Sequence, residues 1–185
     1  MSRTLRVAVV GATGVAGQQA LVSLDGHPWF EVVTLAASPR SAGKKYVDAI
    51  TDQATGHLRW ACDEPLPEWA KDMTVVDAQA LNAAEFDLIF TATDSDSAKV
   101  LEPKFAQTTP VISTTSAFRY EADVPIFIPG INMDHAAILD SQKKNRGWKG
   151  FITPIPNCTT TGLAVSLAPL HAKFGVSGVS MTSMQ

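Results

Sequence analysis

The fold of this chain is decided by the stretch Val7-Ala8-Val9-Val10-Gly11-Ala12-Thr13-Gly14-Val15-Ala16-Gly17. A short apolar run that leads into spaced glycines, and then into a helical pattern up to about residue 25, is typical of a buried strand, a tight turn and a helix. Glycine lets the backbone approach a pyrophosphate closely, and the phosphate charge then lies at the positive end of the helix. Because the spacing is G-x-x-G-x-x-G rather than the commoner G-x-G-x-x-G, a purely structural turn stays open as an alternative.

Strand-like and helical patterns alternate along the following residues. The predicted strands cover residues 5–10, 31–37, 86–92 and 110–113, and the predicted helices cover residues 14–25 and 97–107. This order of βαβ units predicts an α/β fold with a Rossmann-type doubly wound parallel sheet. Residues 44–73 are rich in Pro, Asp, Gln and Trp and have no clear pattern, so we expect an excursion over the surface there.

The C-terminal part of the chain has a different pattern. After a polar stretch at residues 140–149 and a short apolar run at 151–153, a helix is predicted from Cys158 to about residue 173. Residues 176–184 alternate as a strand, which stops at Gln185 without a terminating turn, and we expect further chain to follow. We divide the chain into a nucleotide-binding domain, residues 1–157, and the start of a second α+β domain for substrate binding and dimerisation, residues 158–185.

Composition excludes several classes of protein. The 185 residues are 45% hydrophobic and carry a net charge of −3 without a basic stripe, which argues against nucleic-acid and membrane partners. The two cysteines, Cys62 and Cys158, form no C-x-x-C pair, so neither a disulfide framework nor a metal site is indicated. The N-terminus lacks the pattern of a signal peptide, and we expect a cytoplasmic protein.

The residues after the second predicted strand indicate which dinucleotide is bound. An acidic residue at that point would hold the ribose 2′-hydroxyl of NAD, whereas cations accept the 2′-phosphate of NADP. The strand ends in Ala36-Ala37-Ser38-Pro39-Arg40-Ser41, and the nearest acid, Asp48, lies well beyond it. NADP is therefore the predicted cofactor, although Arg40 and its neighbours Lys44 and Lys45 are also compatible with a solvated loop. The predicted cofactor-binding residues are Gly11, Thr13, Gly14, Val15, Ser38, Arg40 and Ser41.

A cysteine lies where a strand gives way to a helix, in Thr153-Pro154-Ile155-Pro156-Asn157-Cys158-Thr159. The prolines prevent an earlier helical start, and the exposed N–H groups of a helix start favour a thiolate and can donate to a neighbouring oxyanion. A lone cysteine is often inert. A thiol together with a nicotinamide, however, can interconvert an aldehyde and an acyl derivative, because the thiol forms the thioester and the nicotinamide transfers the hydride. Cys62 lies in the unplaced segment without such a setting, and we interpret it as structural.

Nearly the whole chain resembles aspartate-semialdehyde dehydrogenases, in the branch to which archaeal and fungal enzymes and malonyl-CoA reductases are similar. The motifs that carry the resemblance are Val10-Gly11-Ala12-Thr13-Gly14, Ala37-Ser38-Pro39-Arg40-Ser41-Ala42-Gly43-Lys44, Ser116-Ala117-Phe118-Arg119, Asp123-Val124-Pro125, Ile128-Pro129, Asn132, Pro156-Asn157-Cys158-Thr159 and Met184-Gln185. The chain departs from the common family pattern at three positions, Ala16, Thr114 and Gly130.

The resemblance implies roles for four residues. Cys158 is the nucleophile, Asn157 helps to orient the acyl group, Gln185 contacts the reacting substrate, and Arg119 binds phosphate. The family is about twice as long, and its second half supplies a histidine acid/base and the subunit contact. This stretch alone is therefore predicted to be inactive, and the full-length protein to be a homodimer or homotetramer. The histidines of this chain are interpreted as structural or solvated: His27, His57, His135 and His171.

The predicted reaction is the NADP-dependent reductive dephosphorylation of L-aspartyl-4-phosphate to L-aspartate 4-semialdehyde, through a thioester on Cys158. Its small-molecule ligands are aspartyl phosphate, aspartate semialdehyde and free phosphate. One alternative is a malonyl- or other acyl-CoA reductase with the same thiol and cofactor, in which Arg119 has no phosphate role. A second alternative, from another class, is a short NADP-binding protein without catalytic activity.

Overall fold

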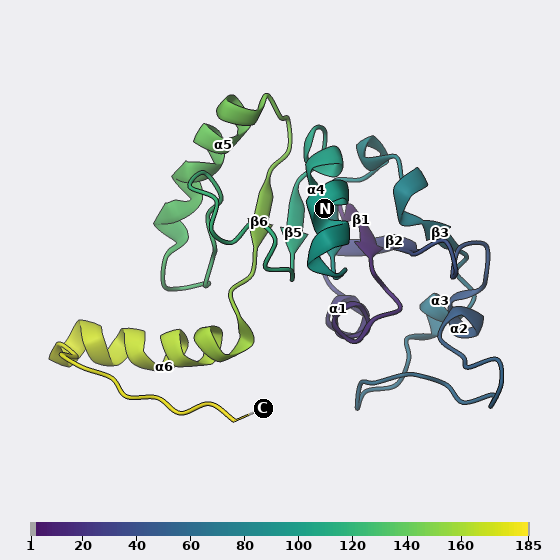
Figure 1. Cartoon of the computed structure of the whole chain (residues 1–185), viewed down its shortest axis with the longest axis horizontal. Helices are drawn as coiled ribbons and strands as arrows, with labels where there is room; N and C mark the ends of the chain where they lie inside the picture. The colour runs from purple at the N-terminus through teal and green to yellow at the C-terminus, as the bar shows by residue number, and fades with distance from the viewer. Residues whose placement is uncertain (1–2, 185) are drawn as a thin grey trace.

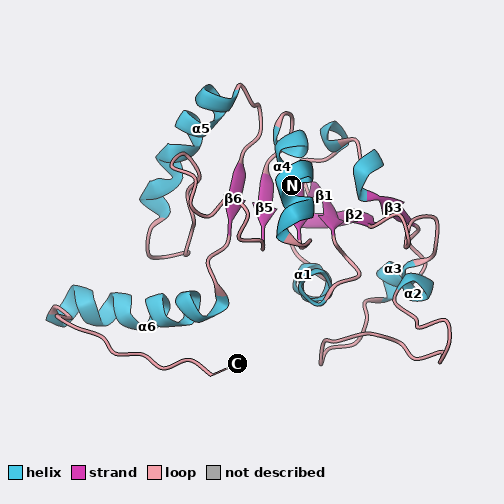
Figure 2. Cartoon of the chain, viewed as in Figure 1, coloured by secondary structure: helices cyan, strands magenta, loops and turns pink. Residues whose placement is uncertain are grey.

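Six parallel strands form one sheet in the computed structural model of the chain, which describes residues 3–184 (Figure 2). The strands are β1 (Leu5–Val10), β2 (Phe30–Ala37), β3 (Val75–Asp77), β4 (Leu88–Thr91), β5 (Val111–Ser113) and β6 (Ile152–Pro154). Their order is β3-β2-β1-β4-β5-β6. This order confirms the predicted Rossmann-type sheet, and the switch between β1 and β4 marks the crevice where such sheets bind ligands.

Helices connect the strands and cover both faces of the sheet (Figure 1). The helices that precede the last strand are α1 (Val15–Leu24), α2 (Tyr46–Ala49), α3 (Glu68–Lys71), α4 (Ser95–Ala106) and α5 (Ile138–Arg146), with short 3₁₀ turns at Ala78–Ala80, Ala83–Glu85 and Met133–Ala137. Helix α6 (Cys158–Phe174) follows β6 and lies apart from the sheet (Figure 1). The predicted helices 14–25 and 97–107 correspond to α1 and α4. Helix α4 begins slightly earlier than predicted because the Asp94 carboxylate accepts hydrogen bonds from the backbone N–H groups of Asp96 and Ser97.

The alternation of side chains along β1 explains its continuous apolar sequence. Val7 and Val9 pack on the face covered by α1, where they join Leu21. Ala8 and Val10 pack on the opposite face with residues of α4. Because a central parallel strand is buried on both faces, it needs apolar residues at every position, and Val7 to Val10 are all fully buried.

Residues 44–73 are not the surface excursion that the sequence predicted. They contain α2 and α3, and the side chains of Tyr46 and Ala70 are fully buried. Tyr46, Ile50 and Leu66 belong to the same core cluster as α1 and β1. Their spacing follows neither a helix nor a strand, because each apolar side chain packs from a separate short element, and periodicity therefore could not reveal them. Strand β3, which directly follows this segment, was also not predicted.

The polar stretch at residues 140–149, for which the sequence predicted no structure, forms most of α5. Its one buried residue is Gln142. The side-chain amide of Gln142 donates to Ile152 O at 3.0 Å, and its oxygen accepts from Ile152 N at 2.7 Å. Since β6 ends the sheet, this glutamine satisfies backbone groups that an edge strand would otherwise leave unpaired.

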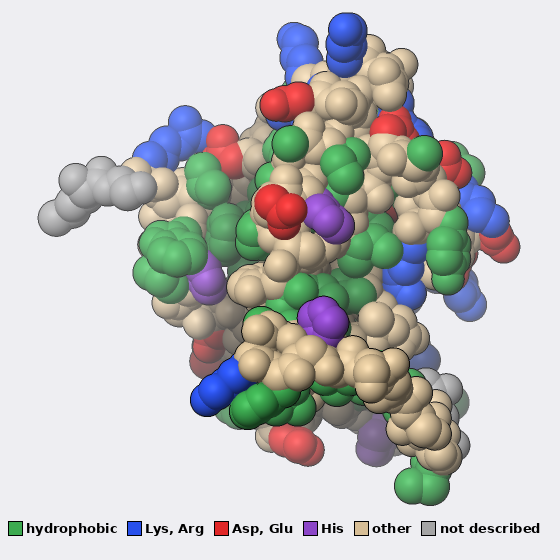
Figure 3. Space-filling model, turned by 90° about the vertical axis from the view of Figure 1, so that its left-hand side faces the viewer, with side chains coloured by type: hydrophobic (Ala, Val, Ile, Leu, Met, Phe, Trp, Pro, Cys, Tyr) green, Lys and Arg blue, Asp and Glu red, His purple; other side chains and the backbone are tan. Residues whose placement is uncertain are grey.

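The predicted helix that starts at Cys158 is confirmed as α6, but the predicted strand at residues 176–184 is wrong for this structure. These residues form neither helix nor strand. A strand needs a neighbouring backbone with which to pair, and no described segment lies in position to provide one (Figure 1). Helix α6 has no buried residue, and it exposes Val165, Leu170 and Phe174. Apolar side chains are visible on the side of the molecule that Figure 3 shows, which is the left-hand side in Figure 1.

Candidate active site

The glycine turn joins β1 to α1 at the carboxyl edge of the sheet. Gly11 has φ of +83°, and a Cβ atom there would lie 2.3 Å from the carbonyl oxygen of Ala92. A Cβ atom at Gly17 would lie 2.2 Å from the carbonyl oxygen of Gly11, so α1 rests directly on the turn. At Gly14 the nearest heavy atom would be 3.5 Å away, which is ordinary contact. Gly11 and Gly17 are therefore required by packing, whereas the surface at Gly14 is open to a ligand.

Helix α1 begins at this open surface without a side-chain cap. Its N-cap residue is Gly14, and no side chain accepts a hydrogen bond from the first turn. The backbone N–H groups there can therefore bind an anion. A cavity of about 270 Å³ begins at this point and runs between the carboxyl ends of the strands. Its lining includes Gly11, Thr13, Gly14, Ser38, Asp77, Gln79, Thr93, Ser97 and Leu101.

A second cavity, of about 510 Å³, shares Thr13, Gly14 and Ser38 with the first. Arg40, Ser41 and Lys44 line it, as does Val15. The structure therefore brings together around the glycine turn all the residues that the sequence predicted to bind the cofactor. Arg40 forms no ion pair with any residue between positions 3 and 184, so its charge is available to a ligand.

Lys45 and Asp48 lie differently from what the sequence suggested. Lys45 pairs with Asp72, their charged atoms lying 2.6 Å apart, and it does not line either cavity. Asp48, which lies beyond the second strand in sequence, lines the second cavity together with Arg40. An acidic group and the predicted phosphate-binding cation thus face the same space.

Helix α2 and the segment between α2 and α3 are attached to the glycine turn and to α1 by hydrogen bonds. The Tyr46 hydroxyl donates to the carbonyl oxygen of Ala12 at 2.7 Å. The buried Gln18 side chain donates to Arg59 O at 2.9 Å and accepts from Ala61 N at 2.7 Å, and it also donates to Thr13 O at 3.2 Å. The wall of the second cavity is therefore held to α1 by side chains that the sequence analysis did not single out.

Arg119 connects the turn after β5 with the chain that leads to Cys158. Its Nε donates to Ile155 O and its Nη2 donates to Thr114 O, each at 3.0 Å. A guanidinium carries five N–H donors, so further N–H groups remain for an anion. Arg119 is half-buried between the carboxyl ends of β5 and β6, and its position relative to the backbone before Cys158 is defined by these bonds.

Cys158 is the first residue of α6 and is exposed. The side-chain oxygen of Asn157 accepts hydrogen bonds from Thr159 N at 2.9 Å and from Thr160 N at 3.3 Å. Asn157 therefore caps α6, and these two N–H groups are not free to stabilise an oxyanion as the sequence suggested. The N–H of Cys158 itself is not among those that Asn157 caps. Gln185, the remaining predicted catalytic residue, lies outside the described residues.

Neither Cys62 nor any of the four histidines lines the two cavities at the glycine turn. Cys62 is half-buried, and burial raises the pKa of its thiol, assisted by the nearby carboxylates of Glu64 and Asp63. The ring of His27 stacks on Phe30 with 4.7 Å between centroids. His135 makes a hydrogen bond to Asn132, and His57 and His171 are exposed.

The first cavity is also lined by residues that the sequence did not indicate. Asp77 is the last residue of β3, a strand too short to be predicted, and Gln79 follows that strand. Ser97 and Leu101 lie on α4. The carboxylate of Asp77 accepts a hydrogen bond from Gln79 N at 2.9 Å. The sequence could have indicated these residues only through their position after a strand, because the carboxyl ends of all parallel strands meet at one edge of the sheet.

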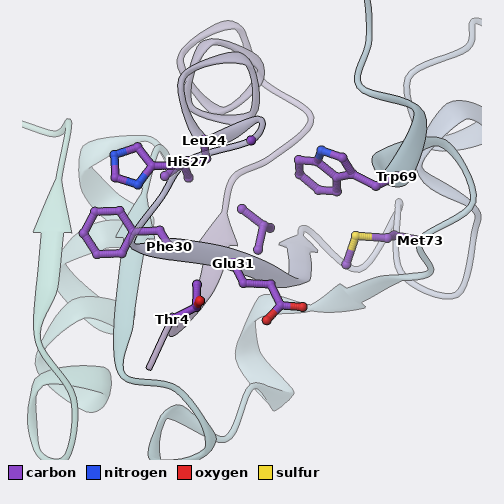
Figure 4. Close-up of a pocket in the computed structure, with 9 residues that line it drawn as sticks. Thr4, Leu24, His27, Phe30, Glu31, Trp69 and Met73 are labelled. Atoms are coloured by element: carbon purple, nitrogen blue, oxygen red, sulfur yellow. The ribbon is translucent and has the colours of Figure 1, made fainter. Parts of the chain in front are cut away.

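A pocket of about 400 Å³ lies at the opposite end of the strands (Figure 4). Its lining includes Thr4, which precedes β1, together with His27, Phe30, Trp69 and Met73. The Trp69 indole donates to the Asp25 carboxylate at 2.8 Å. Because this pocket adjoins the amino ends of β1 and β2, it is separate from the glycine turn and from Cys158.

Comparison with known proteins agrees with this geometry. Residues 6–139 match the family described as "Semialdehyde dehydrogenase, NAD binding domain". The chain belongs to this family. It is 40% identical to an aspartate-semialdehyde dehydrogenase of Methanothermobacter thermautotrophicus, over 98% of the chain and 50% of the relative. It is 34% identical to a malonyl CoA reductase (NADP) of Metallosphaera sedula, over 100% of the chain and 50% of that relative.

A solved structure gives the same result. The aspartate semialdehyde dehydrogenase of Candida albicans, determined with NADP, matches with a TM-score of 0.79 and 38% identity, over 94% of this chain and 48% of that one. The chain thus spans about half the length of the semialdehyde dehydrogenases that it matches. The resemblance stated from the sequence motifs is confirmed, and so is the expectation of a nicotinamide-nucleotide-binding domain.

No helix within residues 3–184 is long and apolar enough to cross a membrane. In the same residues, no three His, Cys, Asp or Glu side chains come together in a way that could hold a metal ion.

Proposed function

We propose that the chain supplies the cofactor site and the nucleophile of an NADP-dependent aspartate-semialdehyde dehydrogenase. The reaction is the reductive dephosphorylation of L-aspartyl-4-phosphate to L-aspartate 4-semialdehyde. The observation that carries the proposal is the position of Arg119, whose guanidinium is bonded to Ile155 O, three residues before Cys158. An acyl phosphate presents both an electrophilic carbon and a dianionic leaving group, and this arrangement offers a thiol for the first and a cation for the second.

Acyl transfer to Cys158 is the first chemical step of the proposal. The thiolate sulfur attacks the acyl carbon, the C–S bond forms, and the C–O bond to phosphate breaks with its electron pair on the phosphate oxygen. Arg119 stabilises the phosphate that leaves, since an arginine fork matches phosphate geometry. The N–H of Cys158, at the start of α6, is the candidate donor to the tetrahedral oxyanion. Asn157, which caps α6, holds that helix start in position.

The residues around the glycine turn fit NADP. The uncapped start of α1 and the open surface of Gly14 suit a pyrophosphate, and Ser38, Arg40 and Ser41 suit a 2′-phosphate. When bound, the nicotinamide supplies the hydride that reduces the thioester to the aldehyde. Both the glycine turn and Cys158 follow parallel strands at their carboxyl ends, so cofactor and thiol lie along one edge of the sheet.

In the proposed full-length protein, the two parts of this chain have different roles. Residues 1–157 bind the nucleotide, and residues 158–185 begin the domain that binds substrate and forms the subunit contact. The exposed apolar side chains of α6 support this division, because a helix with no buried residue needs a covering surface. A homodimer or homotetramer in the cytoplasm is the expected form.

Substitution of Arg119 by Lys tests the proposal in the full-length protein. Lysine keeps the charge but has its donors on a single nitrogen, so it loses the planar fork that reaches Thr114 O and Ile155 O from separate nitrogens and leaves further N–H groups for phosphate. The KM for phosphate, measured in the aldehyde-oxidising direction, should rise by about tenfold or more, while the Kd for NADP stays within about twofold. The matched control is Arg3→Lys, at an exposed arginine that pairs with Asp87. An unchanged phosphate KM in Arg119→Lys would remove Arg119 from the reaction.

Reduction of malonyl-CoA or another acyl-CoA is the second candidate, and the similarity to the malonyl CoA reductase favours it. The same thiol and cofactor would act, with a CoA thiolate rather than phosphate as the leaving group. Full-length protein should be assayed with aspartate semialdehyde, phosphate and NADP, and separately with malonyl-CoA and NADPH. Activity in the second assay alone, unaffected by Arg119→Lys, would favour the reductase.

A further inference from the structure

A buried carboxyl lies beneath the turn that carries Arg119, and the proposed chemistry does not use it. Glu102, on α4, has no solvent exposure. The hydroxyls of Thr91, at the end of β4, and of Ser113, at the end of β5, both donate to its Oε1 at 2.6 Å. Its Oε2 has no hydrogen-bond partner among the described residues. Burial of a carboxyl costs free energy. Glu102 is buried between the ends of two strands that face the candidate site, and this position indicates a role there.

A chain of hydrogen bonds leads from Glu102 to the turn. Ser113 Oγ lies 2.9 Å from Thr115 Oγ1 and accepts from Thr115 N at 3.0 Å. Because the single hydroxyl hydrogen of Ser113 is given to Glu102, the Thr115 hydroxyl must donate to Ser113. Thr115 Oγ1 in turn accepts from Ala117 N at 3.3 Å. All the hydrogen bonds therefore point towards Glu102, which acts as the final acceptor.

The backbone held by this chain is the backbone to which Arg119 is bonded. Thr114 O, which accepts from Arg119 Nη2 at 3.0 Å, lies between the two hydroxyl residues of the chain. Ile155 O, the other acceptor of Arg119, belongs to a residue whose N–H donates to Ser113 O at 2.7 Å. The orientation of the Arg119 guanidinium thus depends on the positions of residues 113–117.

We propose that Glu102 is a positioning residue for anion binding by Arg119: as the terminal acceptor for Thr91 and Ser113, it holds the 113–117 turn and through it the guanidinium. This inference rests on the proposed phosphate role of Arg119. Glu102 touches neither substrate nor cofactor and acts only through the turn. Burial raises the pKa of Glu102, partly offset by the hydrogen bonds from Ser113 and Thr91. In either protonation state Oε1 remains an acceptor, so a glutamine should be able to replace the carboxyl.

Two substitutions of Glu102 in the full-length protein test the proposal. Glu102→Gln keeps an acceptor oxygen, and the KM for phosphate should stay within about twofold of the parent value. Glu102→Met removes the acceptor at similar volume, so the phosphate KM should rise by about tenfold to a hundredfold, while the Kd for NADP changes by less than about twofold. The control is Lys99→Met, an exposed position on the same helix.

A second variant guards against a failure of Glu102→Met to fold. Thr115→Val breaks the chain at its outer link and leaves Glu102, Thr91 and Ser113 in place, and it should raise the phosphate KM in the same direction. Equal losses of phosphate and NADP binding in both variants would overturn the proposal and leave Glu102 as a packing residue. The same conclusion would follow from an unchanged phosphate KM in both variants when Arg119→Lys itself raises that KM.

A spectroscopic measurement separates this inference from the function on which it rests. The Arg119 Nε–H, identified by NMR through its loss in Arg119→Lys, should exchange with solvent at least several times faster in Glu102→Met than in Glu102→Gln. Faster exchange with no change of phosphate KM in Arg119→Lys would mean that Glu102 positions Arg119 but that Arg119 does not serve phosphate. Equal exchange in the two Glu102 variants would overturn the positioning role itself.

Discussion

At the scale of single residues, we expect the loop after β2 to select between NADP and NAD. Arg40 lines the cavity beside the glycine turn and has no ion-pair partner in the described part of the chain, whereas Lys45 is paired with Asp72 outside it. Replacing Arg40 by Ala should weaken NADP binding by roughly 1.5–3 kcal/mol, as for loss of a charged hydrogen-bond partner, and leave NAD binding nearly unchanged.

Titration of the full-length protein with each nucleotide measures this difference. The matched control is Lys45→Ala, which removes the same charge from a position outside the cavity and should change neither Kd. Equal losses for NADP and NAD in Arg40→Ala would mean that the loop has no role in recognising the 2′-phosphate.

The two cysteines should differ in reactivity. Burial and nearby acidic groups raise the pKa of Cys62, so a smaller fraction of its thiol is ionised at neutral pH, and Cys62 is also half-buried. Cys158 is exposed at the start of α6. Iodoacetamide at pH 7 should therefore modify Cys158 faster than Cys62, as read by mass spectrometry of peptides at timed intervals. Cys158→Ser provides the assignment, and equal labelling rates would count against an activated thiol.

Asn157 has one observed role and one proposed role. The resemblance assigns it to orientation of the acyl group, and the structure shows its side chain capping α6. The preference of asparagine for the N-cap is a local property that the sequence contains. Which of the helix-start amides remain free beside the thiol depends on the capping geometry, which the sequence does not contain.

At the scale of elements, the segment between α2 and α3 supports the glycine turn. Gln18 on α1 is almost fully buried and satisfies both Arg59 O and Ala61 N. Gln18→Leu keeps a similar volume and leaves these groups unpaired, so unfolding of the full-length protein should become easier by about 1–3 kcal/mol. NADP binding should weaken as well, because the wall of the second cavity and the turn at Thr13 lose a shared anchor.

Gln19→Leu is the matched control, because Gln19 is the next residue of α1 and its side chain is exposed. Denaturant unfolding of both variants, with NADP titration of each, provides the measurement. If Gln18→Leu and Gln19→Leu behave alike, the hydrogen bonds of Gln18 contribute nothing to the turn.

At the scale of the whole molecule, residues 1–185 alone should bind NADP weakly and should not turn over. The resemblance places the histidine acid/base outside this stretch, and loss of general acid–base catalysis alone costs roughly 10²–10⁴ in rate. Helix α6 has no buried residue. The surface that carries Cys158 is therefore open to solvent, whereas an active site is expected to exclude water. The measurement is an assay of protein verified by mass as 185 residues, beside the full-length enzyme, and substantial activity would contradict the prediction.

The long, regular elements and the glycine turn were predictable from the sequence because their signals are local. The apolar run of β1, the helical patterns of α1 and α4 and the prolines before Cys158 each depend on neighbouring residues, and the structure confirms these elements. The loop with Ser38 and Arg40, proposed to bind the cofactor, could be located for the same reason, since it directly follows a predictable strand.

Tertiary structure alone decided which distant groups meet. Tyr46 and Gln18 reach the glycine turn and its neighbours through hydrogen bonds between separate elements, and Gln142 pairs with the edge of β6. Glu102 receives hydroxyls from the ends of two different strands. Such contacts obey no sequence period, because they depend on which strands become neighbours in the sheet. The sequence by itself therefore determined the type of sheet and the candidate reactive groups, whereas packing between elements determined how those groups are held.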